Sequence, residues 1–228
     1  MSETNDTDTR LVAGLWQVVA EVGWAGLSMR RVAAASGVAP AEIRRRCPTP
    51  HHLLALHGRL VDQAVLAGGL PGFVPGHLPD SNAPRDRIFD VLMRRIDALQ
   101  PHRAGILRLM DDLRGDPLLA LALLAAVPGS MAWMLEAASL GSGGLAGLAR
   151  AQGLTAVWLA TLRAWAGDES IDLGPTMAAL DRALDRAEQV ARVLRLGPGD
   201  AVPDDANMAD EGLGEGPDDE IAAMQQPL

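Results

Sequence analysis

Arginine side chains gather near the N-terminus of this sequence. Residues 28–59 contain six arginines and a single acid, which gives this stretch a net charge of +5. A guanidinium can bind a phosphate or the edge of a guanine through two parallel hydrogen bonds. The cluster therefore predicts a surface for a polyanion such as nucleic acid, with a merely solvated basic face as the alternative. Its members are Arg30, Arg31, Arg44, Arg45, Arg46 and Arg59.

Local signals around these arginines predict two short helices joined by a tight turn. Ser28 can cap the first helix, Gly37 permits the turn, and Pro40 suits the first turn of a second helix over about 41–47. Successive residues of a helix are rotated by about 100°, so the three arginines of the second helix cannot all face the core. Residues 28–54 thus predict a helix-turn-helix, whose second helix fits the major groove of DNA.

The other reactive side chains form no recognisable catalytic or metal-binding set. His51, His52 and His57 have no cysteine or acid beside them at ligand spacing, so we expect surface histidines on a helix. Cys47 has no identifiable His and Asn partners, which favours a half-buried thiol at a helix end. Residues 168–170 are typical of a loop and a helix cap. The sequence indicates no enzyme, no metal site and no cofactor.

Composition predicts an all-α protein, because Ala and Leu total 72 residues while Val, Ile, Thr, Tyr, Phe and Trp together total 35. Further helices are expected over about 9–23, 50–67, 84–99, 154–165 and 175–196, with others beginning near 101 and 116. The last two helices are amphipathic and should pair antiparallel. Residues 141–147 lack the Lys-Ser/Thr ending of a phosphate-binding loop and are expected to form a turn.

Residues 117–135 form a run of 19 residues without a charge. About 20 apolar residues can cross a bilayer. Pro128, Gly129 and Ser130 are expected to break the run, and neither end has the basic cluster that would set an orientation. We therefore expect a buried core helix here and no membrane span.

Charged residues are distributed unevenly along the chain. Residues 200–228 contain nine acids and no base, whereas the rest of the chain contains 20 acids and 20 bases. The acidic tail has too little apolar area to offset ordering, so we expect it to be disordered. A single cysteine and the absence of an opening signal peptide favour the cytoplasm. The predicted divisions are 1–67, a loop at 68–84, a helical domain at 85–198 and the tail at 199–228.

The stretch SMRRVAAASGVAPAEI at 28–43, continued by RRRCPTP at 44–50, resembles the DNA-binding domain of TetR-family transcriptional regulators. The resemblance covers roughly residues 9–60. It implies a TetR-like all-α fold, with an N-terminal three-helix helix-turn-helix domain, a fourth helix as connector, and a larger C-terminal domain for ligand binding and dimerisation. It also implies a homodimer that binds a palindromic operator in double-stranded DNA, responds to a small apolar effector and acts as a repressor.

The resemblance places these roles on particular residues. Those expected to face DNA are Ser28, Arg30, Arg31, Glu42, Arg44, Arg45, Arg46, Thr49 and His51. Those expected to line a ligand pocket, or else simply to fill the core, are Leu92, Ile96, Leu109, Leu123, Met131, Trp133 and Met134. Those expected to form the dimer face are Leu154, Val157, Trp158, Leu162, Trp165, Leu180 and Leu184.

Four positions depart from the family's pattern. Arg44 stands where the family usually has a tyrosine in the recognition helix, Cys47 where it has an aromatic residue, and Pro50 where it has a phosphate-binding lysine. Glu42 replaces a small hydroxyl residue. An acid at that position is expected to face phosphates or base edges, where only the amino group of cytosine would accept it.

The C-terminal half is also similar to the lipid-binding accessory family of ubiquinone biosynthesis, which shares the TetR fold but binds an isoprenoid-like lipid instead of DNA. That resemblance rests on scattered positions, among them Arg85, Ile88, Leu92, Arg95, Arg103, Trp158, Thr161, Trp165, Asp168, Ser170 and Thr176. It implies an alternative function, a lipid-binding module that does not contact DNA.

Overall fold

The computed structural model describes residues 2–68 and 83–193, and most of these residues lie in helices. The elements are α1 (Ser2–Val22), α2 (Met29–Ser36), α3 (Pro40–Arg46), α4 (Pro50–Ala67), α5 (Pro84–Leu99), the short 3₁₀ helix η1 (Gln100–His102), α6 (Arg103–Asp112), α7 (Pro117–Ala137), α8 (Gly144–Ala166) and α9 (Gly174–Val193). These described residues contain no strand, so the predicted all-α fold is confirmed. The predicted tail at 199–228 and most of the predicted loop at 68–84 lie outside the described residues.

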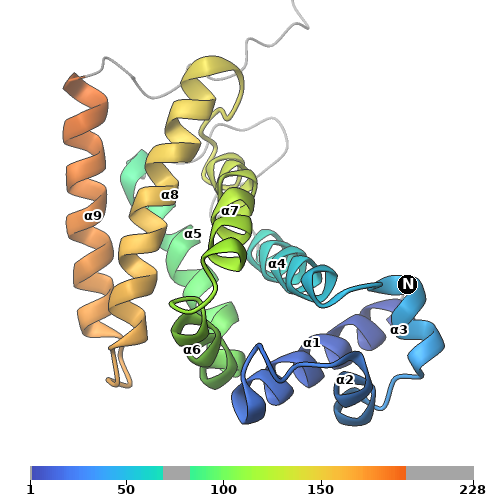
Figure 1. Ribbon diagram of the computed structural model, residues 1–228. Helices are drawn as coiled ribbons and strands as arrows, with labels where there is room; N and C mark the ends of the chain where they lie inside the picture. Colours follow the sequence, from blue (N-terminus) through green and yellow to red (C-terminus); the bar gives the residue numbers. More distant parts are fainter. Residues whose placement is uncertain (1, 69–82, 194–228) are drawn as a thin grey trace, which may run out of the picture.

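The first three helices pack around the apolar face of α1. Leu11, Leu15 and Val19 of α1 are inaccessible to solvent, and they lie in one core cluster with Val32 of α2 and Ile43 of α3. Their burial supplies the main driving force for packing this unit. Figure 1 shows α1, α2 and α3 at one end of the molecule, with α4 running from them into the other helices.

Helix α1 approaches two neighbours closely enough to require glycine. A Cβ on Gly14 of α1 would lie 2.9 Å from the Cβ of Ser36 at the end of α2. On the other side, a Cβ on Gly105 of α6 would lie 2.5 Å from the carbonyl oxygen of Trp16. Because both contacts involve backbone or near-backbone atoms, α1 is held tightly between the N-terminal unit and the C-terminal helices.

Helices α8 and α9 run antiparallel at the far side of the molecule, as predicted (Figure 1). Leu154, Val157, Trp158 and Trp165 of α8 are buried, and they pack in the same core cluster as Leu180 and Leu184 of α9. Asp168 in the connecting turn caps α9, because its carboxylate accepts hydrogen bonds from the backbone amide of Thr176 at 2.9 Å and its hydroxyl at 2.6 Å. The expected loop and cap at 168–170 is therefore confirmed.

Three element boundaries differ from the sequence predictions. Helix α1 begins at Ser2 instead of about residue 9, since its early acids favour the positive end of the helix dipole. Helix α8 begins at Gly144, inside the expected turn at 141–147. Helix α7 continues through Pro128, so the expected break is wrong. Its C-terminal half is anchored by Met131, Met134 and Leu135, which are buried on one side.

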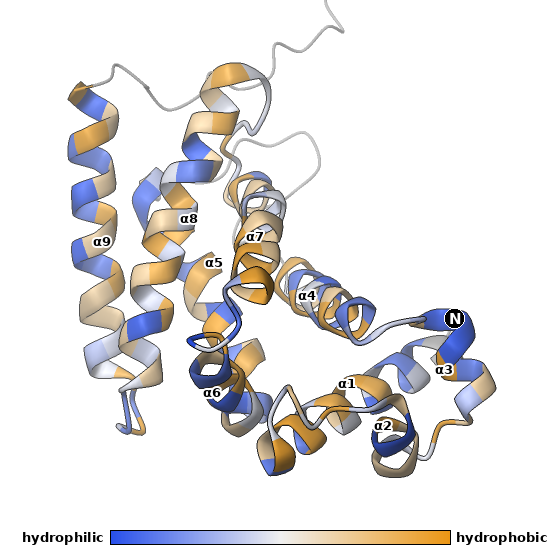
Figure 2. Cartoon of the chain, in the orientation of Figure 1, coloured by the Kyte–Doolittle hydropathy of each residue, from blue (hydrophilic) through white to orange (hydrophobic). Residues whose placement is uncertain are grey.

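Helix α7 is only partly the core helix that was expected. Leu118, Leu121 and Leu124 in its first half are exposed, Leu118 by 77%. In length and composition it is the one helix among the described residues that could cross a membrane, with 22% of its most apolar window buried. Apolar helices of soluble proteins share that property. Most of α7 is coloured as hydrophobic in Figure 2.

A buried ion pair joins the connector α4 to the C-terminal helices. Arg95 of α5, whose side chain is 9% exposed, donates to the carboxylate of Asp62 on α4. The hydroxyl of Ser130 on α7 donates to the same carboxylate at 2.6 Å. The guanidinium carbon of Arg95 lies 5.0 Å from the ring centroid of Trp158 on α8. The pair of Arg95 and Asp62 thus links four helices, α4, α5, α7 and α8.

Removing one member of this pair should be costly because it leaves the other charge buried and unpaired. We expect Asp62→Ala to lower the free energy of unfolding by about 3–5 kcal/mol, measured by urea denaturation. The double variant Asp62→Ala with Arg95→Met should lose less than the sum of the single variants. Asp90→Ala, at an exposed position on α5, is the control and should change stability by less than about 0.5 kcal/mol. Equal losses at Asp62 and Asp90 would contradict the assignment.

Candidate nucleic-acid interface

The predicted helix-turn-helix is present with the expected local chemistry. The backbone amide of Arg31 donates to the Ser28 hydroxyl oxygen at 3.3 Å, so Ser28 caps α2. Gly37 ends α2 in the left-handed conformation, with φ of 66°, where side chains other than glycine are strained. Val38 is then buried, and Pro40 opens α3. Gly37, Val38 and Pro40 thus form the turn between α2 and α3.

Four arginines of this unit are exposed to solvent, two on α2 and two on α3. Arg30 and Arg31 follow the Ser28 cap, and the Arg31 guanidinium donates to the carbonyl of Gly26. Arg44 donates to the carbonyl of Pro48 at 3.2 Å. The Arg45 side chain is 74% exposed. The prediction that the three arginines of α3 cannot all face the core is confirmed by the exposed positions of Arg44 and Arg45.

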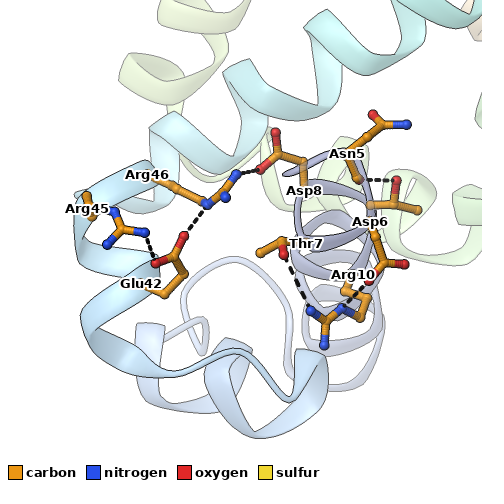
Figure 3. Close-up of polar contacts among 9 residues, drawn as sticks. Asn5, Asp6, Thr7, Asp8, Arg10, Glu42, Arg45 and Arg46 are labelled. Carbon is orange, nitrogen blue, oxygen red and sulfur yellow. Dashed lines mark hydrogen bonds and ion pairs between the residues drawn. The ribbon is translucent and has the colours of Figure 1, made fainter. Parts of the chain in front are cut away.

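The third arginine of α3 has a different environment (Figure 3). Arg46 is 23% exposed and forms ion pairs with Glu42 of its own helix and, at 2.7 Å, with Asp8 of α1. Glu42 also accepts from Arg45. The hydrogen bond from Arg46 lowers the pKa of Glu42, and the bond to Glu42 raises the pKa of Arg46. Glu42 was expected to meet phosphates or bases, but it is engaged by its own arginines.

Helix α4 begins without a side-chain cap. Thr49 occupies the cap position and Pro50 the first turn, yet the Thr49 hydroxyl makes no capping bond. It pairs instead with Nδ1 of His52 at 2.7 Å. His51 is exposed, with its ring edge-on to Trp24 at 5.6 Å. Thr49 and His51 therefore remain at the surface beside α3.

Two reactive side chains are more buried than expected. Cys47 is 1% exposed instead of half-buried, and burial raises the pKa of its thiol. His57 was expected on the surface but is buried, with its ring 4.9 Å from Trp16 and 5.6 Å from His102. Burial lowers the pKa of His57 to about 3, so it is neutral at physiological pH. In the described part of the chain, no three His, Cys, Asp or Glu side chains gather as a metal site.

The side chains expected to line a ligand pocket belong to the core, with one clear exception. Leu92, Ile96, Leu109, Met131 and Met134 are buried, and Leu123 is partly buried. Trp133 was placed with them but is 59% exposed, because it lies one 100° step from Met134. A groove of about 350 Å³ lies elsewhere, between α1, α4, α5 and η1, where His57 and His102 contribute to its wall.

The residues expected to form a dimer face are also interior within one protomer. Six of the seven are buried, and Leu162 is partly buried against the same core. Their periodicity marks the side of α8 and α9 that packs inside the protomer. The opposite side of α8 exposes Leu145, Leu148 and Leu159. Their spacing of three and then eleven residues also places them on one face of a helix. This second apolar stripe was the feature of the sequence that could have indicated an exposed apolar face on α8.

Several residues that carry the lipid-binding resemblance have structural partners. Arg103 donates to the carbonyls of Trp165, Ala166 and Asp168, at the end of α8 and just beyond it. Its guanidinium carbon also lies 4.7 Å from the ring centroid of Trp165. Asp168 is buried, and hydrogen bonds, first from Ser170 and then from Thr176, lower its pKa. These intramolecular contacts give the residues a role in stabilising the fold.

Comparison with solved structures identifies the fold. A TetR transcriptional regulator from Nitrosomonas europaea ATCC 19718 is 22% identical, with a TM-score of 0.60 over 80% of this chain and 98% of that chain. A TetR transcriptional regulator from Rhodococcus sp. RHA1 is 18% identical, with a TM-score of 0.56 over 81% of this chain and 97% of that chain. No family model and no curated protein matches the sequence. The chain therefore has the TetR-like fold that the residues at 28–50 predicted.

The buried His57 should make stability depend on acid pH. Its pKa of about 3 in the folded chain is below the ordinary value of 6.5, so the unfolded chain binds more protons between these values. The free energy of unfolding should fall as pH decreases from about 6.5 towards 3. His57→Phe should show a weaker fall in urea denaturation between pH 7 and 4, whereas His52→Phe, an exposed control, should follow the unsubstituted protein. An unchanged slope in His57→Phe would refute this.

Proposed function

We propose that this protein is a cytoplasmic, ligand-responsive transcriptional regulator of the TetR type that binds DNA as a homodimer and represses transcription. The observation that carries the proposal is the exposed basic surface of a helix-turn-helix set in a TetR-like fold. Arg30, Arg31, Arg44 and Arg45 supply its exposed positive charge. Guanidinium groups recognise phosphates and guanine edges, which together give affinity and sequence preference.

In the proposed complex α3 enters the major groove. Arg44 and Arg45 approach base edges or phosphates from α3, while Arg30 and Arg31 approach the backbone from α2. Ser28, Thr49 and His51 flank them at the surface. Ser28 is already occupied as a cap, so its contribution is to hold the start of α2 towards the duplex.

Control by a small apolar effector would act through α4. The Asp62 and Arg95 ion pair fixes α4 to three C-terminal helices, so a compound that favours another packing of those helices would also shift α4. Such a compound would select one spacing of the two recognition helices from the ensemble. Repression would then be relieved when that spacing no longer fits the operator.

The proposed dimer uses the outer face of α8. Leu145, Leu148 and Leu159 give that face its apolar centre, and the exposed side of α9 adds charges of both signs at 181–186. A twofold contact of this kind is self-complementary. It would set the two α3 helices about one turn of DNA apart, roughly 34 Å, on a palindromic site.

The lipid-binding alternative has less support. Its resemblance includes Arg95, Arg103 and Asp168, and each of these has intramolecular partners that account for it. The exposed arginines of α2 and α3 have no role in such a module. DNA binding therefore explains more of the described surface.

Selection of bound fragments from the host genome at two salt concentrations tests DNA binding. If each protomer neutralises about three to five phosphates, the logarithm of affinity should fall by about 0.9 per phosphate for each decade of salt. The recovered fragments should share a palindrome with half-sites one helical turn apart. A flat salt response, or no enriched fragment, would rule out the proposal.

A charge on the outer face of α8 should dissociate the dimer. We expect Leu148→Glu to shift the sedimentation coefficient to that of a monomer at micromolar concentration, because an unpaired carboxylate would be buried at the contact. Leu118→Glu, at an exposed leucine of α7, is the matched control and should remain dimeric. Dissociation by Leu118→Glu alone would move the interface to α7.

A further inference from the structure

The three arginines of α3 are not equivalent. Arg46 joins α3 to the first turns of α1 through Asp8, a residue 38 positions earlier in the chain, at 2.7 Å. It also bonds to Glu42 one turn back on α3. Figure 3 shows its guanidinium between the two carboxylates, while Arg45 reaches Glu42 from the other side. Arg44 has no acidic partner among these contacts and bonds to a backbone carbonyl.

The burial of these side chains follows the same division. Arg46, Asp8 and Glu42 have side chains that are each less than a quarter exposed, whereas Arg45 is largely exposed. To turn its Nε and Nη1 donors to a phosphate, Arg46 would have to give up two charge-assisted hydrogen bonds, which are about twice as strong as neutral ones. Arg44 and Arg45 can turn towards a duplex at a smaller cost.

Helix α3 also needs an anchor of this kind. It has seven residues, and Ile43 is the buried one among them. So short a helix has little intrinsic stability and depends on its tertiary contacts. The bond from Arg46 to Asp8 supplies a polar tie between α3 and α1, the helix that forms the centre of the unit.

We propose that Arg46 is a positioning residue, held off the DNA by Asp8 and Glu42, which fixes α3 on α1 and leaves Arg44 and Arg45 as the cations that α3 offers to the duplex. This inference rests on the proposed DNA-binding function. It assigns Glu42 a role too, because its carboxylate holds Arg46 and orients Arg45 at the same time.

The deciding variant removes the tie without changing the net charge. In the double variant Asp8→Asn with Arg46→Gln, one acid and one base are lost together. We expect its salt dependence to equal that of the unsubstituted protein, measured by fluorescence anisotropy with a selected genomic fragment. Its specific affinity should fall while its affinity for unrelated DNA stays constant, because α3 is less well positioned. Arg46→Lys, which keeps a cation beside Asp8, should restore most of the specific affinity.

Two results would overturn this assignment. If Arg46 contacts a phosphate, the double variant should lose about 0.9 from the salt slope for each protomer. If Arg46 does not position α3, the double variant should bind specific DNA as tightly as the unsubstituted protein. Arg44→Gln is the positive control, and it should lower specific affinity about tenfold or more, through the loss of a phosphate or base contact.

A second measurement separates this inference from the proposed function. A double-mutant cycle on Asp8 and Arg46 by urea denaturation requires no DNA, and it should give a coupling of roughly two- to fivefold in the folding equilibrium constant. The exposed pair of Asp6 and Arg10 within α1 is the matched control and should give a smaller coupling. No coupling between Asp8 and Arg46 would overturn the inference. Absence of DNA binding with the coupling retained would overturn the proposed function, and of the inference it would leave only the role of Arg46 in fixing α3 on α1.

Discussion

The position of the basic surface depends on how α1 is packed. One side of this helix buries Leu11, Leu15 and Val19, and the close contacts at Gly14 and Gly105 set its distances to α2 and α6. Apolar burial is strong but non-directional, so it would not by itself fix the rotation of α3 about its axis. The directional contact is the polar one between Asp8 and Arg46. Apolar packing therefore sets how closely the helices approach, and the polar contact sets the rotation of α3.

A similar division holds at the junction between the two ends of the molecule. Trp16 and His57 pack apolar and neutral aromatic surface there, and Arg95 with Asp62 adds a buried ion pair. A buried ion pair contributes little net stability compared with apolar residues. Any arrangement that breaks it is destabilised, however, because a buried charge is left without its partner. The junction thus favours one orientation of α4. In a ligand-controlled regulator, a contact of this kind separates two discrete orientations of a helix, and a ligand can shift the population from one to the other.

The sequence predicted the local structure of the site better than its environment. Ser28, Gly37 and Pro40 act within one turn of the chain, so their roles could be inferred without tertiary contacts. The partner of Arg46 could not, because Asp8 lies in a stretch that was expected to precede the first helix. The same limitation placed Glu42 against DNA and His57 on the surface. Each error concerns which distant segment covers a side chain.

Periodicity has a related limit, which α7 and α8 make clear. A 3.6-residue repeat identifies residues that share a helix face, but it does not distinguish a face buried in the protomer from one that remains open. On α8 the strong stripe containing Trp158 is internal, and the weaker stripe with Leu148 is exposed. Along α7 nearly every residue is apolar, so no face could be selected and Trp133 was misplaced. Where a helix is apolar all round, only the arrangement of its neighbours decides which side chains are available for a partner.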